Sequence, residues 1–230
     1  MNVLEYEMID ILKRLKDEYG VFEIKAEYEN EGSRQEELCR LKDITSKVGL
    51  PIIMKIGGVE AVTDIYNAIT LGVNGIIAPM AETKFAVSKF LGAINTFVAE
   101  DNRNDIEFAI NVETITCYDN FDDILSLPNI NTLSGVTIGR VDFTSSMGKD
   151  RSFADSDEML RHCENIFTKA RAKGLKCGLG GAISAKSCDF IKYLISKGLL
   201  DKYETRKIVY HKDAVNNIEA GILAGVEFEL

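Results

Sequence analysis

Two acidic residues follow apolar runs in a way that predicts a metal site. Glu113 closes the run Phe-Ala-Ile-Asn-Val-Glu, and Asp142 closes the run Gly-Val-Thr-Ile-Gly-Arg-Val-Asp. If both runs are parallel strands, their carboxyl ends meet at one rim, where two carboxylates can hold Mg²⁺ or Mn²⁺. The residues alone leave an equal alternative, in which Glu113 caps a helix and Asp142 begins a turn.

Further charged residues near strand ends could bind or deprotonate a substrate. Lys25, Glu27 and Glu29 alternate with apolar residues, so they share one face of a strand. Inside a barrel mouth such a face is either a salt-bridge network or a catalytic wall. Lys55 and Arg140 end two other apolar runs and are candidates for contacts with an anionic substrate.

Glycines close to the strand ends indicate tight turns or anion sites. Gly57 and Gly58 follow the Lys55 run, where backbone amides can approach a ligand oxygen before a helix starts. Tight turning explains such a pair equally well. Downstream, Ser33 is the expected N-cap of the helix carrying Arg34, and Ser184 is the expected cap after a second glycine pair.

The elements that position these residues alternate along the chain as short Val- and Ile-rich runs and longer segments of helical period. This pattern is typical of repeated βαβ units and predicts a parallel α/β barrel of the TIM type. A helix is expected over Glu5–Tyr19, and no eighth strand is found. An open doubly wound sheet is the alternative, but no GxGxxG loop follows the first strand. The seven predicted strands are Val21–Glu29, Pro51–Ile56, Gly75–Ala78, Glu107–Glu113, Gly135–Gly139, Leu175–Leu179 and Lys207–Tyr210.

The composition of the chain argues against several classes of protein. The 230 residues predict one domain spanning 1–230, and the net charge of -9 without a basic run disfavours nucleic acid. No run is long and apolar enough for a membrane span or signal peptide, so we expect a cytoplasmic protein. The five cysteines form no CxxC pair, which argues for reduced thiols. Patterns typical of serine hydrolases, zincins and P-loop proteins do not occur.

Three stretches resemble the HpcH/HpaI aldolase and citrate lyase β family, over roughly residues 20 to 215. Gly-Val-Asn-Gly-Ile-Ile-Ala-Pro-Met-Ala-Glu-Thr is similar to the family's G-A-x-G…P-M-V-E-T segment. Asn-Val-Glu-Thr is similar to its Q-I-E-T, and Gly-Arg-Val-Asp-Phe-Thr-Ser-Ser-Met-Gly to its G-P-x-D-L-x-x-S-L-G. The resemblance implies that Glu113 and Asp142 are the metal ligands.

The resemblance also implies that Lys55 stands where family aldolases have a carboxylate-binding arginine. A larger departure occurs where pyruvate aldolases show D-x-E-H, because this chain has Lys-Ala-Glu-Tyr, with Tyr28 at the histidine position. Glu27, Glu29 or a metal-bound water would have to replace that base. The family further implies a shortened N-terminus with a helix over 1–20, and a homo-oligomer in which the C-terminal helix, 212–230, packs on its own barrel or is exchanged between subunits.

These observations lead to one main hypothesis, a class II carbon–carbon lyase of the aldolase type. Mg²⁺ or Mn²⁺ would stabilise the enolate of a pyruvate-like 2-oxo acid, with an aldehyde or acyl compound as the second substrate. The alternatives are an acyl-CoA lyase of the citrate-lyase type and a non-catalytic barrel that binds metal and oxo acid. The residues predicted to be catalytic are Glu27, Glu29, Lys55 and Arg140, and those predicted to bind substrate are Lys25, Lys55, Gly57, Gly58, Gly139 and Arg140.

Overall fold

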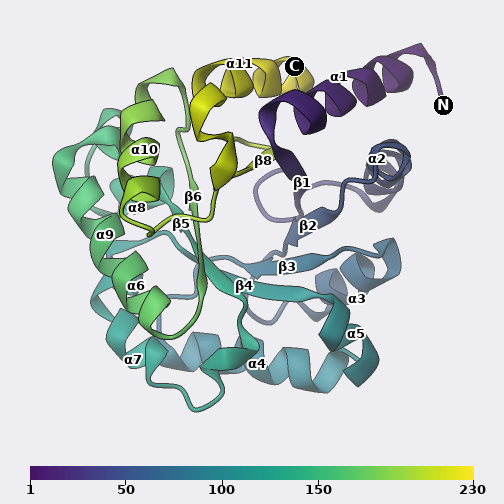
Figure 1. Cartoon of the computed structure of the whole chain (residues 1–230). Helices are drawn as coiled ribbons and strands as arrows, with labels where there is room; N and C mark the ends of the chain where they lie inside the picture. The colour runs from purple at the N-terminus through teal and green to yellow at the C-terminus, as the bar shows by residue number, and fades with distance from the viewer.

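The computed structural model describes residues 1–230 and shows a closed barrel of strands surrounded by helices (Figure 1). The predicted TIM-type α/β barrel is therefore confirmed. Strands β1 to β7 run parallel, whereas β8 is antiparallel to both β7 and β1. The strands in barrel order are β1 (Val21–Glu27), β2 (Ile52–Lys55), β3 (Gly75–Ala78), β4 (Glu107–Val112), β5 (Gly135–Gly139), β6 (Lys176–Gly180), β7 (Lys202–Glu204) and β8 (Ile208–His211).

The eighth strand, which was not found in the sequence, is β7. Lys-Tyr-Glu contains one apolar residue in three, so it gives no periodic signal. A short turn joins β7 to β8, and this hairpin closes the barrel against β1. Because a hairpin reverses the chain, the last strand cannot be parallel as predicted.

Helices form the outer layer. Most follow the usual amphipathic pattern, with an apolar face against the strands, whereas the short helix Glu100–Asp105 has no buried residue. Short 3₁₀ helices at Ile130–Thr132, Arg151–Asp155, Ala185–Ser187 and Lys212–Asn217 complete the connections. The α-helices are α1 (Val3–Tyr19), α2 (Gln35–Val48), α3 (Val62–Leu71), α4 (Lys84–Phe97), α5 (Glu100–Asp105), α6 (Ile115–Asp119), α7 (Phe121–Leu125), α8 (Arg140–Ser146), α9 (Asp157–Ala172), α10 (Cys188–Ser196) and α11 (Ile218–Glu229).

Helices α1 and α11 lie side by side over the strands β1 and β8 (Figure 1). The Tyr210 hydroxyl donates a hydrogen bond to the Gly221 carbonyl of α11 at 2.8 Å, which ties that helix to β8. Within this chain the C-terminal helix thus packs on its own barrel, and its exchange between subunits stays a prediction. None of the helices has the length and apolar character that a membrane crossing requires.

The barrel has two separate apolar layers. The larger cluster fills the space between the strands and the helices. Inside the barrel only Ile53, Ile77 and Val209 form a buried apolar cluster, with Phe22 and Ala109 packed against it. The rest of the interior is strongly polar, because charged residues of β1, β2 and β7 point inward.

Local boundaries differ slightly from the prediction. Strand β1 ends at Glu27 rather than Glu29, so Glu29 lies in the following turn. The α2 helix has Arg34 as its N-cap, in place of Ser33, and Arg34 donates both its backbone N–H and a guanidinium N–H to the Glu37 carboxylate. Ser184 does act as a cap, with its side chain accepting from the Lys186 amide, as predicted.

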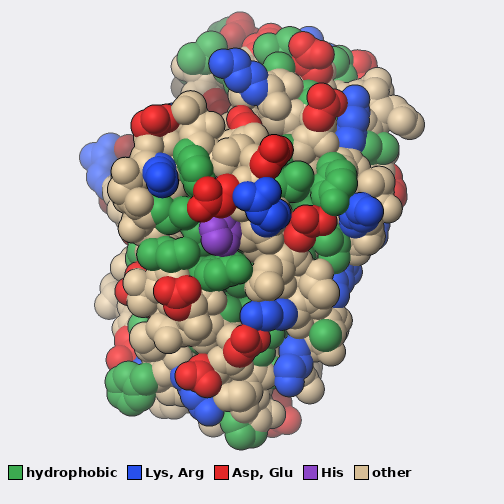
Figure 2. Space-filling model, turned by 90° about the vertical axis from the view of Figure 1, so that its left-hand side faces the viewer, with side chains coloured by type: hydrophobic (Ala, Val, Ile, Leu, Met, Phe, Trp, Pro, Cys, Tyr) green, Lys and Arg blue, Asp and Glu red, His purple; other side chains and the backbone are tan.

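Figure 2 shows one face of the molecule, on which acidic and basic side chains are interspersed without a large basic patch. Such a mixture does not attract a polyanion.

Candidate active site

Glu113 lies directly after β4 and is almost completely buried, with 2 % of its surface exposed. Its Oε1 accepts the Met80 backbone N–H at 3.0 Å, and its Oε2 accepts Asn111 Nδ2 at 3.1 Å. Burial raises the pKa of Glu113 above its usual value, against the lowering effect of Lys55 and of these hydrogen bonds. The carboxylate is therefore held rigidly at the rim.

The loop after β3 contributes to that rigidity. Met80 follows Pro79 and adopts a positive φ of 49°, a left-handed conformation that is uncommon for a residue with a side chain. This conformation directs the Met80 N–H toward Glu113. Backbone strain of this kind costs about 1–3 kcal/mol and is concentrated at functional sites.

Asp142 lies near Glu113, in the first turn of α8. It is exposed at the barrel mouth, and its charge contributes to the raised pKa of Glu113. Gly139, at the end of β5, lies close to the Glu113 side chain. A Cβ on this glycine would approach Glu113 Oε2 to 2.9 Å. The structure therefore places the two predicted metal ligands at one rim, with a glycine that leaves room for the buried carboxylate.

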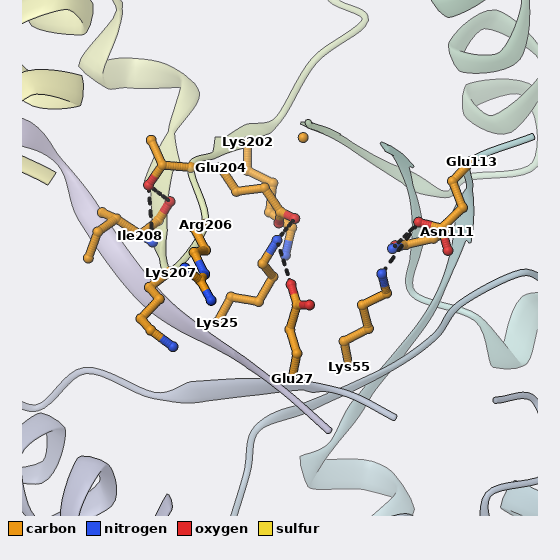
Figure 3. Close-up of polar contacts among 12 residues, drawn as sticks. Lys25, Glu27, Lys55, Asn111, Glu113, Lys202, Glu204, Arg206, Lys207 and Ile208 are labelled. Atoms are coloured by element: carbon orange, nitrogen blue, oxygen red, sulfur yellow. Dashed lines mark hydrogen bonds and ion pairs between the residues drawn. The ribbon is translucent and has the colours of Figure 1, made fainter. Parts of the chain in front are cut away.

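Lys55 extends from β2 toward the same carboxylate. Its Nζ lies 3.5 Å from Glu113 Oε2 and 2.7 Å from Glu29 Oε2. Burial acts to lower the pKa of Lys55, but Glu113, Glu29 and Glu27 outweigh it and hold that pKa above its usual value. Lys55 is thus a fixed positive charge beside Glu113 (Figure 3).

A second ion-pair group occupies the neighbouring part of the mouth. Lys25 Nζ lies 2.7 Å from Glu204 Oε1 and 3.4 Å from Glu27 Oε1, between the two carboxylates (Figure 3). Burial acts to lower the pKa of Lys25, yet the two glutamates hold it above its usual value. Lys25 therefore stays protonated at neutral pH and is no candidate for a nucleophilic amine.

A cavity of about 370 Å³ opens at this mouth. Asp142, Lys25 and Glu27 line it, and basic side chains of Arg151 and Arg206 contribute to its wall. This volume is near the lower limit for small-molecule sites, and the mixture of charges suits a compact polar ligand better than a large apolar one.

Arg140 corrects one expectation of the sequence analysis. Its guanidinium is fully buried and donates to the carbonyl oxygens of Gly181 at 2.9 Å and Ala154 at 2.8 Å, and to Asp155 Oδ1 at 2.7 Å. It also stacks over the Phe190 ring at 4.9 Å. With its donors engaged inside the protein, Arg140 holds the β6 loop in place and does not face a substrate.

Gly57 also departs from its predicted role. Its backbone N–H donates to Asp64 Oδ2 at 2.7 Å, so a carboxylate of the protein already occupies the anion position expected there. The turn containing Gly57 and Gly58 caps the approach to α3 and serves the fold. The alternative interpretation of this pair, a tight turn, is the one that the structure supports.

Three residues at the barrel mouth were not identified from the sequence. Asn111 precedes Glu113 by two positions, so the period of two in a strand could have identified it. Its Oδ1 is buried without a hydrogen-bond partner. Glu204 lies in the short β7, and Arg151 lies in a 3₁₀ turn. Neither of these segments has an apolar pattern from which a position at the rim could be predicted.

With this geometry established, comparison with known families is informative. The model of the family HpcH/HpaI aldolase/citrate lyase matches residues 37–181. This chain belongs to that family. Its members are lyases and aldolases, and a divalent cation is the family's usual cofactor. The matched range includes Lys55, Glu113 and Asp142.

Several solved structures share the fold of this chain. The HpcH/HpaI aldolase from Desulfitobacterium hafniense DCB-2 is 12% identical, with a TM-score of 0.68 over 87% of this chain and 82% of that chain. The citrate synthase SbnG is 16% identical, with a TM-score of 0.66 over 96% of this chain and 89% of that chain. The Haloferax volcanii malate synthase is 15% identical, with a TM-score of 0.60 over 86% of this chain and 62% of that chain. No curated protein matches this chain.

Proposed function

We propose that this protein is a metal-dependent carbon–carbon lyase that acts on a pyruvate-like 2-oxo acid through its enolate. The observation that carries this proposal is the position of Glu113 and Asp142 at one rim of the barrel, with Lys55 3.5 Å from Glu113. Membership in a family of lyases and aldolases supports the same class of reaction.

The residues at this rim fit a hard divalent cation such as Mg²⁺ or Mn²⁺. Glu113 and Asp142 are oxygen donors, and the Asn111 Oδ1 beside Glu113 is a buried oxygen without a hydrogen-bond partner. No group of three or more acidic, histidine or cysteine side chains is close enough together to hold a metal ion by itself. Two carboxylates suit Mg²⁺, which commonly keeps several waters and substrate oxygens among its ligands.

A bound cation would supply Lewis-acid stabilisation of the negative charge that develops on the keto oxygen. The protein residues would orient the substrate. Lys55 would bind the substrate carboxylate, although without the two-pronged geometry of an arginine. Glu27 and Lys25 line the cavity and would face the reacting carbon. Glu29 is engaged with Lys55 and would fix the position of that ammonium group.

The aldolase reaction is favoured over the acyl-CoA alternative by the shape and charge of the mouth. A coenzyme A ester needs a long groove with basic phosphate contacts, whereas this cavity is about 370 Å³, and its three basic residues, Lys25, Arg151 and Arg206, are outnumbered by four acidic residues. These residues are Glu27, Asp142, Glu204 and Glu229. We therefore propose an aldehyde as the second substrate, and we propose that the enzyme acts as a homo-oligomer in the cytoplasm.

Exchange of the pyruvate methyl protons in heavy water, followed by proton NMR with Mg²⁺ or Mn²⁺ supplied, tests the proposal. The wild-type protein should catalyse the exchange, and Glu113→Gln should slow it by about 100-fold, since a principal ligand is lost. Glu107→Gln is the matched control, because Glu107 lies at the opposite end of the same strand and pairs with Lys176. Wild-type exchange in Glu113→Gln would remove Glu113 from the mechanism, and no exchange by the wild type would refute the proposed function.

A further inference from the structure

One carboxylate in the barrel mouth, that of Glu204, has no role in the function proposed above. Glu204 of β7 is 3 % exposed, and its Oε1 accepts from Lys25 at 2.7 Å. Its Oε2 is buried and has no hydrogen-bond partner. An unsatisfied buried polar atom costs about 1–3 kcal/mol, and more when it is charged. A native protein that retains such an atom calls for an explanation in terms of function.

The position of Glu204 mirrors that of Glu113. A Cβ on Gly180 would lie 3.1 Å from Glu204 Oε1, just as one on Gly139 would lie 2.9 Å from Glu113 Oε2. Gly139 and Gly180 are direct partners in the β5–β6 pairing. Neighbouring strands are about 4.8 Å apart, so the two carboxylates extend over adjacent glycines at the same level of the barrel.

Glu204 also faces the cavity assigned to the substrate. It lines this cavity together with Asp142, Lys25 and Glu27. A ligand that lies beside Asp142 in this cavity is therefore within the reach of the Glu204 side chain. Glu204 thus belongs to a wall of the proposed active site.

The other candidates for proton transfer are engaged elsewhere. Tyr28, at the position of the family histidine, donates its hydroxyl to Gln35 Oε1 at 2.8 Å on the helical side of the sheet. Glu29 Oε2 also has no hydrogen-bond partner, but it lies 2.7 Å from the Lys55 ammonium group, and Glu29 does not line the cavity. Glu27 shares Lys25 with Glu204 and keeps no buried oxygen without a partner. Glu204 alone among them combines burial, a free oxygen and a place on the cavity wall.

We propose that Glu204 is the residue that moves the proton at C3 of the 2-oxo acid, an inference that rests on the proposed function. Glu204 Oε2 takes a proton from C3, and the C–H electron pair forms the C2–C3 double bond while the carbonyl electron pair moves onto oxygen. The products are an enolate and a neutral Glu204 carboxylic acid. The reverse transfer returns a proton to C3 when no aldehyde adds.

Lys25 acts as the positioning residue for this step. Its ammonium group holds Glu204 Oε1 through a short charge-assisted hydrogen bond and so leaves Oε2 as the reactive oxygen. Glu27, on the other side of Lys25, balances the remaining charge of that ammonium group.

Two reactions of the same enolate separate proton abstraction from the rest of the mechanism. Exchange of the pyruvate methyl protons needs a base, whereas loss of CO₂ from oxaloacetate produces the same enolate without proton abstraction. Both rates are measured on the Mg²⁺-loaded wild type and on Glu204→Gln, along with oxalate affinity by calorimetry. The ratio of exchange to decarboxylation should fall by at least about 100-fold in the variant, the usual contribution of a general base. Oxalate affinity should change less than about threefold.

The matched control is Glu23→Gln. Glu23 forms another ion pair with a lysine inside the barrel, with Lys202 at 2.9 Å. This variant loses a similar pair without touching the cavity, so its ratio of rates should equal that of the wild type. An unchanged ratio in Glu204→Gln would overturn the assignment, and so would an equal fall in both variants. If the wild type catalyses neither reaction, the proposed function itself fails, which is a different result from either of these.

Discussion

The carboxylate of Glu113 lies over Gly139, so close that a methyl group on that glycine would approach Oε2 to 2.9 Å. The two residues come from the ends of neighbouring strands, β4 and β5. The glycine contributes space rather than an interaction, and this space allows the buried carboxylate to reach the rim. The candidate site therefore depends on a residue without a side chain as much as on its charged groups.

Replacing that glycine should disturb the site without unfolding the barrel. In Gly139→Ala the new methyl group would displace the Glu113 carboxylate, and we expect exchange of the pyruvate protons to slow by about 10- to 100-fold, as small misplacements of reacting groups do. Manganese affinity, measured by electron paramagnetic resonance, should fall in parallel.

Gly92→Ala serves as the control for this substitution. Gly92 lies in α4, and a Cβ there would meet no atom within 4 Å. Alanine should stabilise this exposed helical position by about 0.5–1 kcal/mol and leave exchange unchanged. Equal rates in Gly139→Ala and the wild type would show that the close approach to Glu113 is unimportant.

Arg140 should be important for stability because its charge is completely buried. Arg140→Met would leave the carbonyl oxygens of Gly181 and Ala154 without donors and would free Asp155. Breaking a buried, hydrogen-bonded ion pair costs about 3–5 kcal/mol, so urea unfolding should show a loss of this size.

The exposed pair of Arg34 with Glu37 offers the comparison. Its arginine side chain is 75% exposed, so Arg34→Met should change the free energy of unfolding by less than about 1 kcal/mol. A loss of similar size in the two variants would contradict the structural role assigned to Arg140.

His162 should make the stability depend on pH. Its ring packs against Tyr118 with centroids 4.6 Å apart and against Phe143 at 5.5 Å. Burial lowers the pKa of His162 below its usual value, although Glu158 opposes the shift. The unfolded chain then binds a proton at His162 more readily than the folded chain does. The stability contributed by the neutral, packed imidazole is therefore present above about pH 6.5 and is lost as the pH falls below it.

Urea unfolding of the wild type and of His162→Phe on either side of that pH provides the measurement. The phenylalanine variant cannot gain this proton, so its free energy of unfolding should fall less than that of the wild type between about pH 7.5 and about pH 5.5. An identical pH dependence in the two proteins would show that His162 is not responsible.

The sequence by itself determined the barrel, because alternation of Val- and Ile-rich runs with amphipathic segments specifies strands and helices locally. It also placed Glu113 and Lys55 at strand ends and Asp142 just past one, since each of these charged residues closes an apolar run. It could not find β7, whose three residues carry no periodic pattern, and so it could not find Glu204.

Tertiary structure decided the role of each charged side chain. Arg140 and Gly57 stand at positions that the sequence marks as rim positions, yet Asp155 and Asp64 occupy their donors. Asp155 lies in a 3₁₀ helix and Asp64 in the first turn of α3. The sequence does not reveal that these carboxylates meet the donors of Arg140 and Gly57. Only the closed barrel determines whether a charge at the rim is satisfied inside the protein or left open to a ligand, because burial and pairing together set that outcome.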